Sequence, residues 1–339
     1  MTQRTIPVRF LRAAARTARR RDVDAQEWLD HLGIDPELLF DDRARITLEQ
    51  ATEIVQELWR LTGDEWVGLG ARPSPFGTFR MVCLGLMSAP DLRGVMERAR
   101  DFSRVLPGLP TFDLEVGERT TQLTLDTESL DDPDHFVTDI ALSVGLRFFS
   151  WLAGSRLPVE QVSLPYERPE RAEDYDQVFG RRIAFGQATA SLRFSNELLT
   201  LPVMRTEEEL EEWLRNAPAD LLMYRDYGAT PADQVRRILE RGLRGPWPTP
   251  DEVASQLAMS TQHLRRVLRE DDTSMSAIKE ELLRDAAIAS LVAGEETIAA
   301  LSERLGFSEP SAFHRAFRRW TGSAPGAYRP KSAQDASDD

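Results

Sequence analysis

Residues 297–322 read TIAALSERLGFSEPSAFHRAFRRWTG, and this stretch decides the fold of the C-terminal region. Thr297 precedes a short segment of apolar periodicity, and Gly306 is typical of the residue that follows a helix C-terminus. Ser308 is expected to cap a second helix, with Pro310 in its first turn. The stretch therefore predicts helix, tight turn, helix, an arrangement that can place its second helix in a DNA major groove.

The same pattern occurs earlier in the chain. Thr249 and Glu252 predict a capping box, and Ser260 is expected to cap the next helix, 48 residues before Ser308. Residues 274–292 favour one long helix that joins the two modules. The helical periodicity turns basic and polar side chains outward on both second helices, namely Gln262, Arg265, Arg266, Arg269, His314, Arg315, Arg318 and Arg319.

Averaged over the whole chain, the net charge of −14 argues against nucleic acid as a binding partner. The local distribution of charge matters more than this average. Residues 231–330 are neutral and contain two local basic clusters, whereas residues 1–230 carry −12. An arginine-rich helix face is usually just a solvated surface, and one helix-turn-helix pattern is common in helical proteins. Two copies with basic outward faces make DNA binding the better interpretation.

Residues 233–329 resemble the double helix-turn-helix domain of the AraC/XylS family of transcriptional regulators. Residues 298–322, followed by Pro325 and Tyr328-Arg329, carry the family signature. The resemblance implies sequence-specific binding to double-stranded DNA, with these side chains facing the groove: Gln262, Arg265, Arg266, Ser311, His314 and Arg315. Arg318 and Arg319 are expected to contact phosphates.

Three positions depart from the family pattern. Asp272 replaces a glycine after the first recognition helix, Leu283 replaces an arginine on the linker helix, and Leu301-Ser302 replaces Ile-Ala. The departures leave the expected fold intact and bear on the DNA affinity of the first module and on its packing against the linker helix.

The N-terminal region mixes helix and strand patterns without a βαβ repeat, which favours an α+β domain. Helices are expected at residues 47–61, 91–105, 138–152 and 205–214. Strands are expected at residues 111–116 and 120–126, as a hairpin around Gly117, and at residues 159–165 and 190–194. The predicted fold is thus an α+β N-terminal sensor domain followed by an all-α double helix-turn-helix DNA-binding domain.

Residues 7–201 resemble the arabinose-binding-type sensor domain of one branch of the same family. The matching motifs are GIDPELL at 33–39, RI at 45–46, LTGD at 61–64, VFG at 178–180 and IAF at 183–185. The resemblance implies effector sensing and dimerisation, without naming the effector. We expect a sensing and dimerisation domain at 1–216, a linker at 217–231, the DNA-binding domain at 232–330 and a disordered acidic tail at 331–339.

Composition and motifs exclude several other classes. The single cysteine, Cys83, excludes an intramolecular disulfide and a cysteine-based metal site, and it is expected to be a buried hydrophobe. The four histidines lack ligand spacing, and the acidic segment 131–135 reads as a solvated turn rather than a metal site. No apolar run reaches the roughly 18 residues of a membrane span, and the first twenty residues lack a secretory apolar core. We expect a cytoplasmic protein without metal, cofactor or membrane partner.

An enzyme is the alternative of a different class. The sequence contains no P-loop, no dinucleotide-binding glycine pattern, no nucleophile elbow and no HExxH motif. We therefore expect no catalytic residues.

The effector pocket is expected on apolar helix faces, although pockets and cores use the same residue types. The candidate effector-binding residues are Phe76, Phe79, Met81, Met87, Phe102, Phe148 and Trp151, although plain core is the better interpretation of each position taken singly. The expected partners are double-stranded DNA, a small-molecule effector, RNA polymerase and a second copy of the chain through the N-terminal domain. An activating role is what the resemblance implies, and the sequence itself does not distinguish activation from repression. Two alternatives remain open: an effector-independent DNA-binding protein whose N-terminal domain only mediates assembly, and an enzyme fused to a DNA-binding domain.

Overall fold

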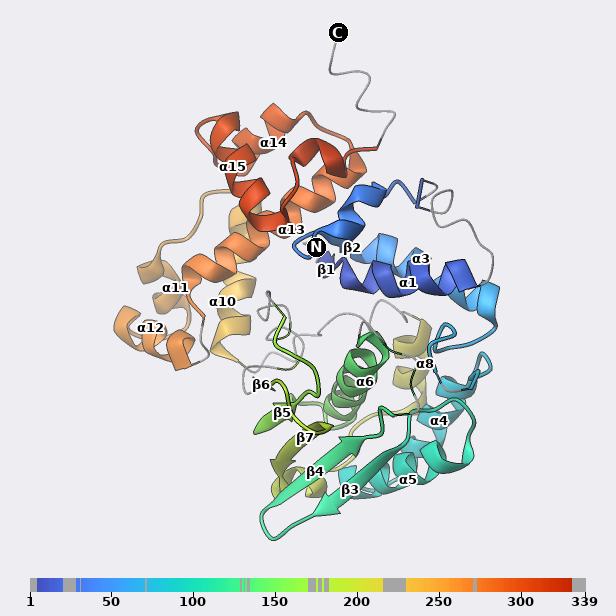
Figure 1. Ribbon diagram of the computed structural model, residues 1–339. Coiled ribbons are helices and arrows are strands. Elements are labelled where there is room, and N and C mark those ends of the chain that lie inside the picture. The colour runs from blue at the N-terminus through green and yellow to red at the C-terminus, as the bar shows by residue number, and fades with distance from the viewer. Residues whose placement is uncertain are drawn as a thin grey trace. The chain divides into compact units, whose positions relative to one another are not determined.

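The structure is a computed structural model that divides into two compact units (Figure 1). Unit 1 comprises Met1–Val8, Asp24–Ala51 and Gly228–Asp339, and unit 2 comprises Arg9–Val23 and Thr52–Tyr227. The structure describes residues 5–20, 29–30, 32–70, 72–128, 130, 132, 135–169, 175, 179, 183–215, 230–270 and 273–330.

The two units do not follow the continuous division expected from the sequence. Residues 1–8 and 24–51, expected in the N-terminal domain, belong to the same unit as Gly228–Asp339. The physical reason is a set of buried hydrogen bonds between segments about 280 residues apart, which no local pattern reveals. The expected linker, except for residues 230 and 231, and the expected acidic tail lie outside the described residues.

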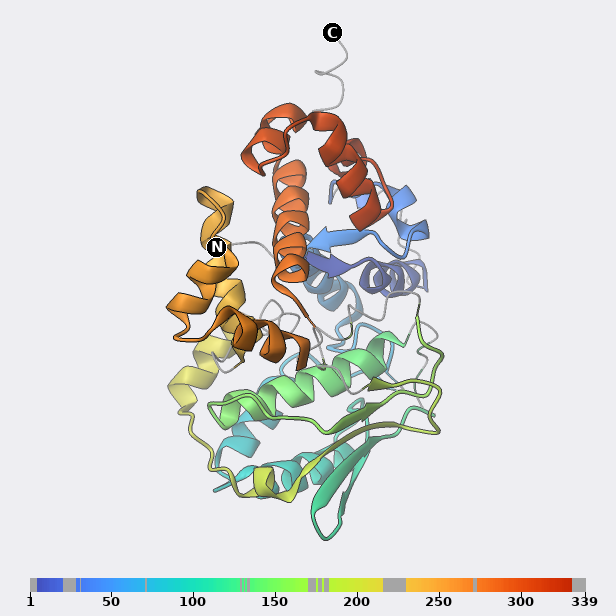
Figure 2. The same cartoon turned by 90° about the vertical axis from the view of Figure 1, so that its left-hand side faces the viewer.

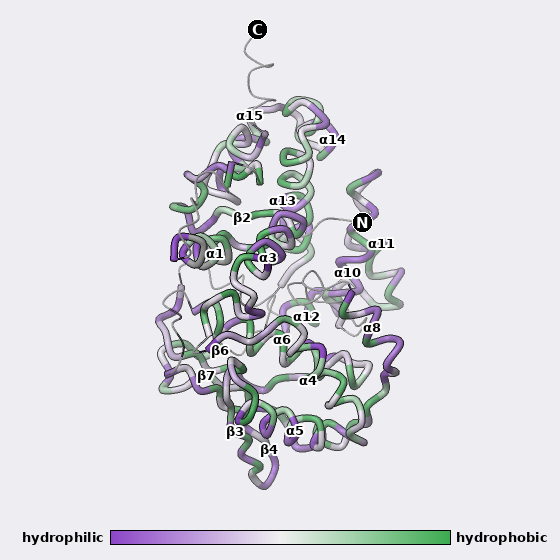
Figure 3. The backbone as a smooth tube through the Cα atoms, turned by 90° about the vertical axis from the view of Figure 1, so that its right-hand side faces the viewer, coloured by the Kyte–Doolittle hydropathy of each residue, from purple (hydrophilic) through white to green (hydrophobic). Residues whose placement is uncertain are grey.

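Unit 2 is built on a five-stranded sheet whose strand order is β3-β4-β7-β5-β6. The strands are β3 (Phe112–Val116), β4 (Thr120–Leu125), β5 (Gln161–Ser163), β6 (Ile183–Ala184) and β7 (Ala190–Ser195). All pairs are antiparallel except β5 with β6. The register places Leu114, Leu123 and Leu192 in one row and Gln122 beside Arg193 on the other face. The sheet therefore has one apolar face and one polar face, and in Figure 3 the β3–β4 hairpin alternates in hydropathy.

Helices cover the apolar face of this sheet and form the main core of unit 2 with it. These helices are α4 (Thr78–Met87), α5 (Leu92–Val105), α6 (Phe136–Leu152) and α8 (Glu207–Arg215), with a 3-10 turn η2 (Asn196–Thr200). Helix α1 (Arg9–Arg20) also belongs to unit 2. Asp91 caps α5 by accepting a hydrogen bond from the Gly94 backbone N–H at 2.9 Å. Helix α3 (Leu48–Thr62) begins in unit 1 and continues in unit 2. A capping box at its start pairs Thr47 with Gln50.

Unit 1 is helical except for one two-stranded ribbon. The ribbon pairs β1 (Thr5–Pro7) with β2 (Arg45–Thr47). The 3-10 turn η1 (Pro36–Phe40) precedes β2 in the chain. The helices are α10 (Pro231–Glu240), α11 (Pro250–Gln256), α12 (Thr261–Glu270), α13 (Met275–Ala293), α14 (Ile298–Arg304) and α15 (Pro310–Thr321), with 3-10 turns η3 (Arg241–Arg244) and η4 (Pro325–Tyr328). Figure 2 shows α13 as the long helix with α14 and α15 at its C-terminal end.

The predicted fold class is confirmed, because a helix-and-sheet region is combined with a helical double helix-turn-helix region. The sequence did not predict β1, β2 or β6, which are only two or three residues long and too short for a visible alternation. The expected cap at Ser308 is wrong, since the N-cap of α15 is Glu309 and makes no side-chain cap hydrogen bond. Within the described residues, every helix is too short or too polar to cross a membrane.

Candidate nucleic-acid interface

The first helix-turn-helix consists of α11 and α12. Thr249 and Glu252 form the predicted capping box, in which the Glu252 carboxylate accepts from the Thr249 backbone N–H at 2.7 Å. The hydrogen bonds from Thr249 hold the pKa of Glu252 below its ordinary value. Ser260 caps α12 through the His263 backbone N–H at 3.2 Å. Leu264 of α12 is buried in one core with side chains of α10, α11 and α13, so the fold fixes which face of α12 points outward.

The outward face of α12 carries the first set of predicted DNA-binding residues. Gln262, Arg265 and Arg266 are all exposed. Arg266 forms an ion pair with Glu270 one turn later at 3.2 Å, and both side chains are 61% exposed. Such an exposed pair contributes about 0.3–0.5 kcal/mol to stability. The Arg266 side chain can therefore leave Glu270 for another partner at little cost in free energy. Arg265 makes no ion pair or side-chain hydrogen bond in the part of the chain that the structure describes.

The second helix-turn-helix consists of α14 and α15. Thr297 caps α14 through the Ala300 backbone N–H at 3.1 Å, and Gly306 adopts the expected left-handed conformation with φ of +85°. Phe307 follows the turn and packs edge-on against Phe313, with ring centroids 5.4 Å apart. Phe313 and Phe317 are fully buried, which anchors the inner face of α15.

The outward face of α15 carries the second set. Ser311, His314, Arg315, Arg318 and Arg319 are all exposed. Among the described residues, Arg315 and Arg318 have no ion pair or side-chain hydrogen bond. Their guanidinium groups can therefore bind a phosphate or a base edge without breaking an internal contact.

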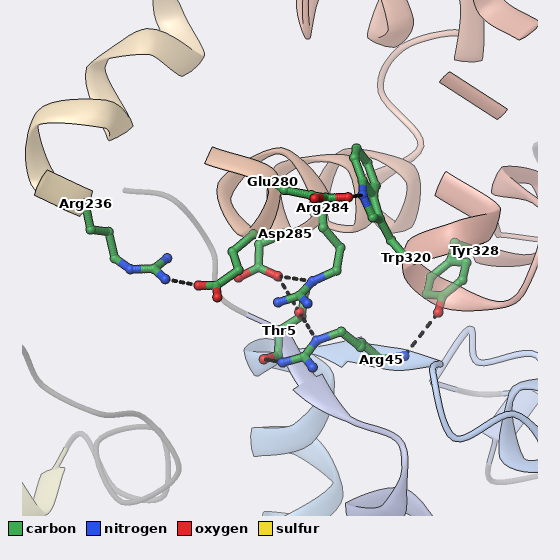
Figure 4. Close-up of polar contacts among 9 residues, drawn as sticks. Thr5, Arg45, Arg236, Glu280, Arg284, Asp285, Trp320 and Tyr328 are labelled. Atoms are coloured by element: carbon green, nitrogen blue, oxygen red, sulfur yellow. Dashed lines mark hydrogen bonds and ion pairs between the residues drawn. The ribbon is translucent and has the colours of Figure 1, made fainter. Parts of the chain in front are cut away.

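Arg319 differs from these two arginines because it already has an acidic partner. Its guanidinium donates a hydrogen bond at 2.5 Å to Glu280 of α13. The same Glu280 oxygen accepts from the Trp320 indole N–H at 2.6 Å. Burial would raise the pKa of Glu280, but the hydrogen bonds from Arg319 and Trp320 outweigh it and the pKa lies below its ordinary value. Arg319 thus links α15 to the long helix, an arrangement that Figure 4 shows for Trp320 and Glu280.

Helix α13 joins the two modules. Its 19 residues span about 28 Å at 1.5 Å per residue. Ile278 and Leu282 belong to the core of the first module, and helices α14 and α15 also pack against α13.

The N-terminal ribbon packs against α13 through buried polar groups (Figure 4). Thr5 Oγ1 donates to Asp285 Oδ1 at 2.7 Å and accepts from Arg45 Nε at 2.7 Å, while Arg284 Nε donates to the same Asp285 oxygen at 3.1 Å. The Arg45 backbone N–H donates to the Tyr328 hydroxyl at 3.1 Å. Burial raises the pKa of Tyr328 to about 12, so the hydroxyl stays protonated.

Gly322, at the C-terminus of α15, also meets the N-terminal segment. It has φ of +79°, and a Cβ added there would lie 1.7 Å from an Asp41 carboxylate oxygen. Glycine is therefore required by backbone conformation and by close approach at once. The second module is supported on this side by residues that the sequence assigned to another domain.

All eight predicted DNA-binding residues lie on α12 or α15 and are exposed, but sequence reasoning missed the groups that hold these helices. In the sequence, Glu280 is one of several charged residues on a long helix. Thr5, Arg45 and Asp285 belong to no recognisable motif. A signal existed only for Tyr328, which falls within the family signature.

The candidate effector-binding residues divide into three groups in unit 2. Phe76, Phe79 and Phe148 line a cavity of about 400 Å³. Phe102 and Met87 are half-buried and pack against the core, and Trp151 is buried in it, stacked on Trp213. Met81 is exposed.

The residues considered for other chemistry do not assemble a site within the described chain. Cys83 is buried as expected, and burial raises the pKa of its thiol. Asp131, Pro133 and Asp134 of the acidic turn lie outside the described residues. Where the structure describes the chain, it groups no three histidine, cysteine or acidic residues around a common metal position.

Comparisons with known proteins bear on both regions. Residues 23–203 match the arabinose-binding domain of AraC transcription regulator, N-terminal, and residues 253–331 match a helix-turn-helix domain. The chain is 24% identical over 331 residues to an ornithine utilization regulator of Pseudomonas aeruginosa, covering 97% of each protein. It is 27% identical over 349 residues to an uncharacterised HTH-type transcriptional regulator of Mycobacterium tuberculosis, covering 95% of each.

Among solved structures, the transcriptional regulator CdpR from Pseudomonas aeruginosa matches 94% of this chain and 98% of its own, with 17% identity and a TM-score of 0.32. The N-terminal match spans more than half of the chain, and the helix-turn-helix match covers α11 to α15. With two helix-turn-helix modules joined by α13 and a sensor-type N-terminal region, the chain belongs to the AraC family of DNA-binding transcription regulators.

Proposed function

We propose that α12 and α15 are recognition helices that enter successive major-groove segments on one face of double-stranded DNA. The observation that carries this proposal is the pair of exposed helix faces, each fixed by a buried core and each presenting an arginine that has no partner among the described residues. Arg265 and Arg315 are the proposed base-reading arginines, because a planar guanidinium can bind guanine O6 and N7 together. Gln262, Arg266, Ser311 and His314 complete the groove-facing set.

Arg318 and Arg319 receive different roles. Arg318 is exposed and unpaired in the described chain, so it is the proposed phosphate contact of α15. Arg319 was expected to contact phosphate as well, but its ion pair with Glu280 supports a role in holding α15 against α13. In this proposal the electrostatic attraction to DNA comes from a local basic face on an acidic protein.

The test is the dependence of binding on salt. If several arginines neutralise phosphates, log affinity falls with log salt with a slope of roughly 0.9 per phosphate contacted. The measurement is a titration of the full chain with a duplex obtained by binding selection, repeated at several salt concentrations. An affinity that stays constant across these concentrations contradicts the proposal.

We infer that unit 2 senses a small molecule and that this is how DNA binding is controlled. The cavity lined by Phe76, Phe79 and Phe148 supports this inference over a domain that only mediates assembly. A regulator of this kind acts in the cytoplasm, where its DNA lies. Transcription in vitro with purified RNA polymerase distinguishes activation from repression.

Self-association is proposed to use the N-terminal region. Strand β3 is an edge of the sheet in unit 2, and Val105 and Val116 are exposed apolar residues of the same unit. Sedimentation of the full chain and of a fragment that begins at Thr230 tests this assignment. A fragment that dimerises while the full chain is monomeric contradicts it.

A further inference from the structure

We propose that the cavity of unit 2 binds an uncharged, predominantly hydrocarbon ligand. That this ligand controls DNA binding rests on the function proposed above, whereas the binding itself does not. Three features of the cavity support the proposal: its volume, the chemistry of its wall and one glycine that faces it.

The cavity has the size of a small-molecule site and an apolar wall. Its volume is about 400 Å³, which is roughly the volume that 13 molecules occupy in liquid water. This volume lies within the usual range of ligand pockets. Leu86 of α4, Leu123 of β4 and Leu192 of β7 contribute to the wall, together with Phe148 of α6. Apolar cavities are poorly hydrated, because a water molecule inside needs two to four polar partners. An apolar ligand therefore enters without displacing well-bound water.

Three polar side chains of the wall, those of Glu65, Ser103 and Arg80, already have hydrogen-bond or ion-pair partners within the described chain. Glu65 accepts hydrogen bonds from the Gly77 and Phe79 backbone N–H groups, both at 2.7 Å, and so caps the start of α4. Ser103 Oγ donates to the Arg100 carbonyl oxygen at 2.8 Å. Arg80 forms an ion pair with Glu211. A sugar or an amino acid would lose its hydration at this wall without regaining hydrogen bonds from these three side chains.

The charge of the wall disfavours an anion. The Arg80 side chain is 51% exposed and paired with Glu211, so the half-buried carboxylate of Glu65 is the more buried charge among the described wall residues. A ligand carboxylate in the cavity would face a like charge in a medium that screens poorly. The wall therefore favours an uncharged molecule over a fatty acid of the same length.

Gly145 provides an independent observation. It lies in the middle of α6, faces the cavity and has no positive φ. A Cβ added there would have only one neighbour within 4 Å, a ring carbon of Phe149 at 3.9 Å. Neither the backbone nor the packing requires glycine at this position, although glycine weakens a helix interior. By contrast, a Cβ at Gly85 of α4 would lie 2.7 Å from Phe102. We infer that the space in front of Gly145 is occupied by the ligand.

The experiment is thermal unfolding of the full chain with straight-chain alcohols from hexanol to dodecanol. The proposal expects the alcohols to raise the unfolding temperature, with an optimum chain length, because a chain longer than the cavity leaves its excess carbon atoms in water. Decanoate, L-arabinose and L-ornithine are expected to give no shift. Gly145→Leu places a four-carbon side chain in part of the cavity, so it is expected to remain folded and to reduce the shift, most strongly with the longer alcohols. Gly145→Ala, which adds one methyl group, is expected to favour shorter chains.

Gly85→Ala is the matched control. It is expected to lower the unfolding temperature through its clash with Phe102 but to retain the alcohol-induced shift. The absence of a shift with every alcohol overturns the proposal, as does a shift whose size and dependence on chain length are unchanged in both Gly145 variants. A shift by arabinose, ornithine or decanoate that Gly145→Leu abolishes overturns the ligand class. If the alcohols bind in the cavity and DNA affinity does not change, the ligand site stands and the effector role fails.

Discussion

Arg315→Ala separates base recognition from folding in the second module. Arg315 is exposed on α15 and makes no ion pair or side-chain hydrogen bond with any residue that the structure describes. Its removal should change the free energy of unfolding by no more than about 0.5 kcal/mol. Loss of a bidentate arginine–guanine contact costs about 1–3 kcal/mol, which is roughly a fivefold to 140-fold loss of affinity for the preferred site. The preference should relax at a few adjacent base pairs, and Arg265→Ala should relax a second patch about one helical turn away.

The assay is a binding selection from randomised duplexes at fixed salt, combined with thermal unfolding of each variant. Arg318→Ala is the matched control on the same face, since a phosphate contact weakens all sequences alike and its loss reduces the salt slope by about one. Arg319→Ala is the structural control, because its exposed pair with Glu280 contributes about 0.2–1 kcal/mol to stability. If Arg315→Ala stays folded and selects the same sites with unchanged affinity, the assignment of α15 as a recognition helix is refuted.

Three further predictions concern the stability of unit 1. Phe317→Ala should cost about 3–5 kcal/mol, because the ring is fully buried against Phe313 and Tyr328; an unchanged denaturant midpoint would contradict this. The pKa of Glu280 is lowered in the folded state, so this carboxylate contributes to the free energy of unfolding above about pH 4.5. The contribution is lost as the pH falls toward the pKa of the folded state. Glu280→Gln should flatten the acid limb of the unfolding temperature measured against pH, and an unaltered limb would refute the role of this carboxylate. Tyr328→Phe should cost about 1–3 kcal/mol, since it removes the acceptor of the buried Arg45 N–H; a variant as stable as the wild type would count against this contact.

The sequence was sufficient for the helix-turn-helix modules because their signals are local. Thr249 and Glu252 lie three residues apart, and the capping hydrogen bonds at Ser274 and Thr297 also act within one turn. The apolar periodicity of α12 and α15 then fixes which side chains are buried, so exposure of the eight candidate residues follows from helix geometry. The β3–β4 hairpin was predictable for the same reason, since its turn is short and its strands alternate.

The sequence did not separate cavity from core among the seven candidate effector-binding residues. Phe148 lines the cavity, while Trp151, three residues later on the same helix, is buried in the core. Both are large aromatic residues on an apolar helix, and a cavity depends on how elements meet rather than on the composition of one element. Gly145 was not predicted either, because a glycine becomes informative only when the space in front of it is known.

The sequence alone determined the fold class, the two helix-turn-helix modules and the outward faces of α12 and α15, since each depends on residues within a turn or a hairpin of one another. Only the tertiary structure decided that Thr5 and Arg45 meet Asp285 and Tyr328, and that Glu280 holds Arg319 and Trp320. These partners are separated by about 40 to 280 residues, and a single threonine, arginine or glutamate carries no mark of a distant partner. Burial makes such polar pairs necessary, because an unpaired polar group in the interior costs more than one in water.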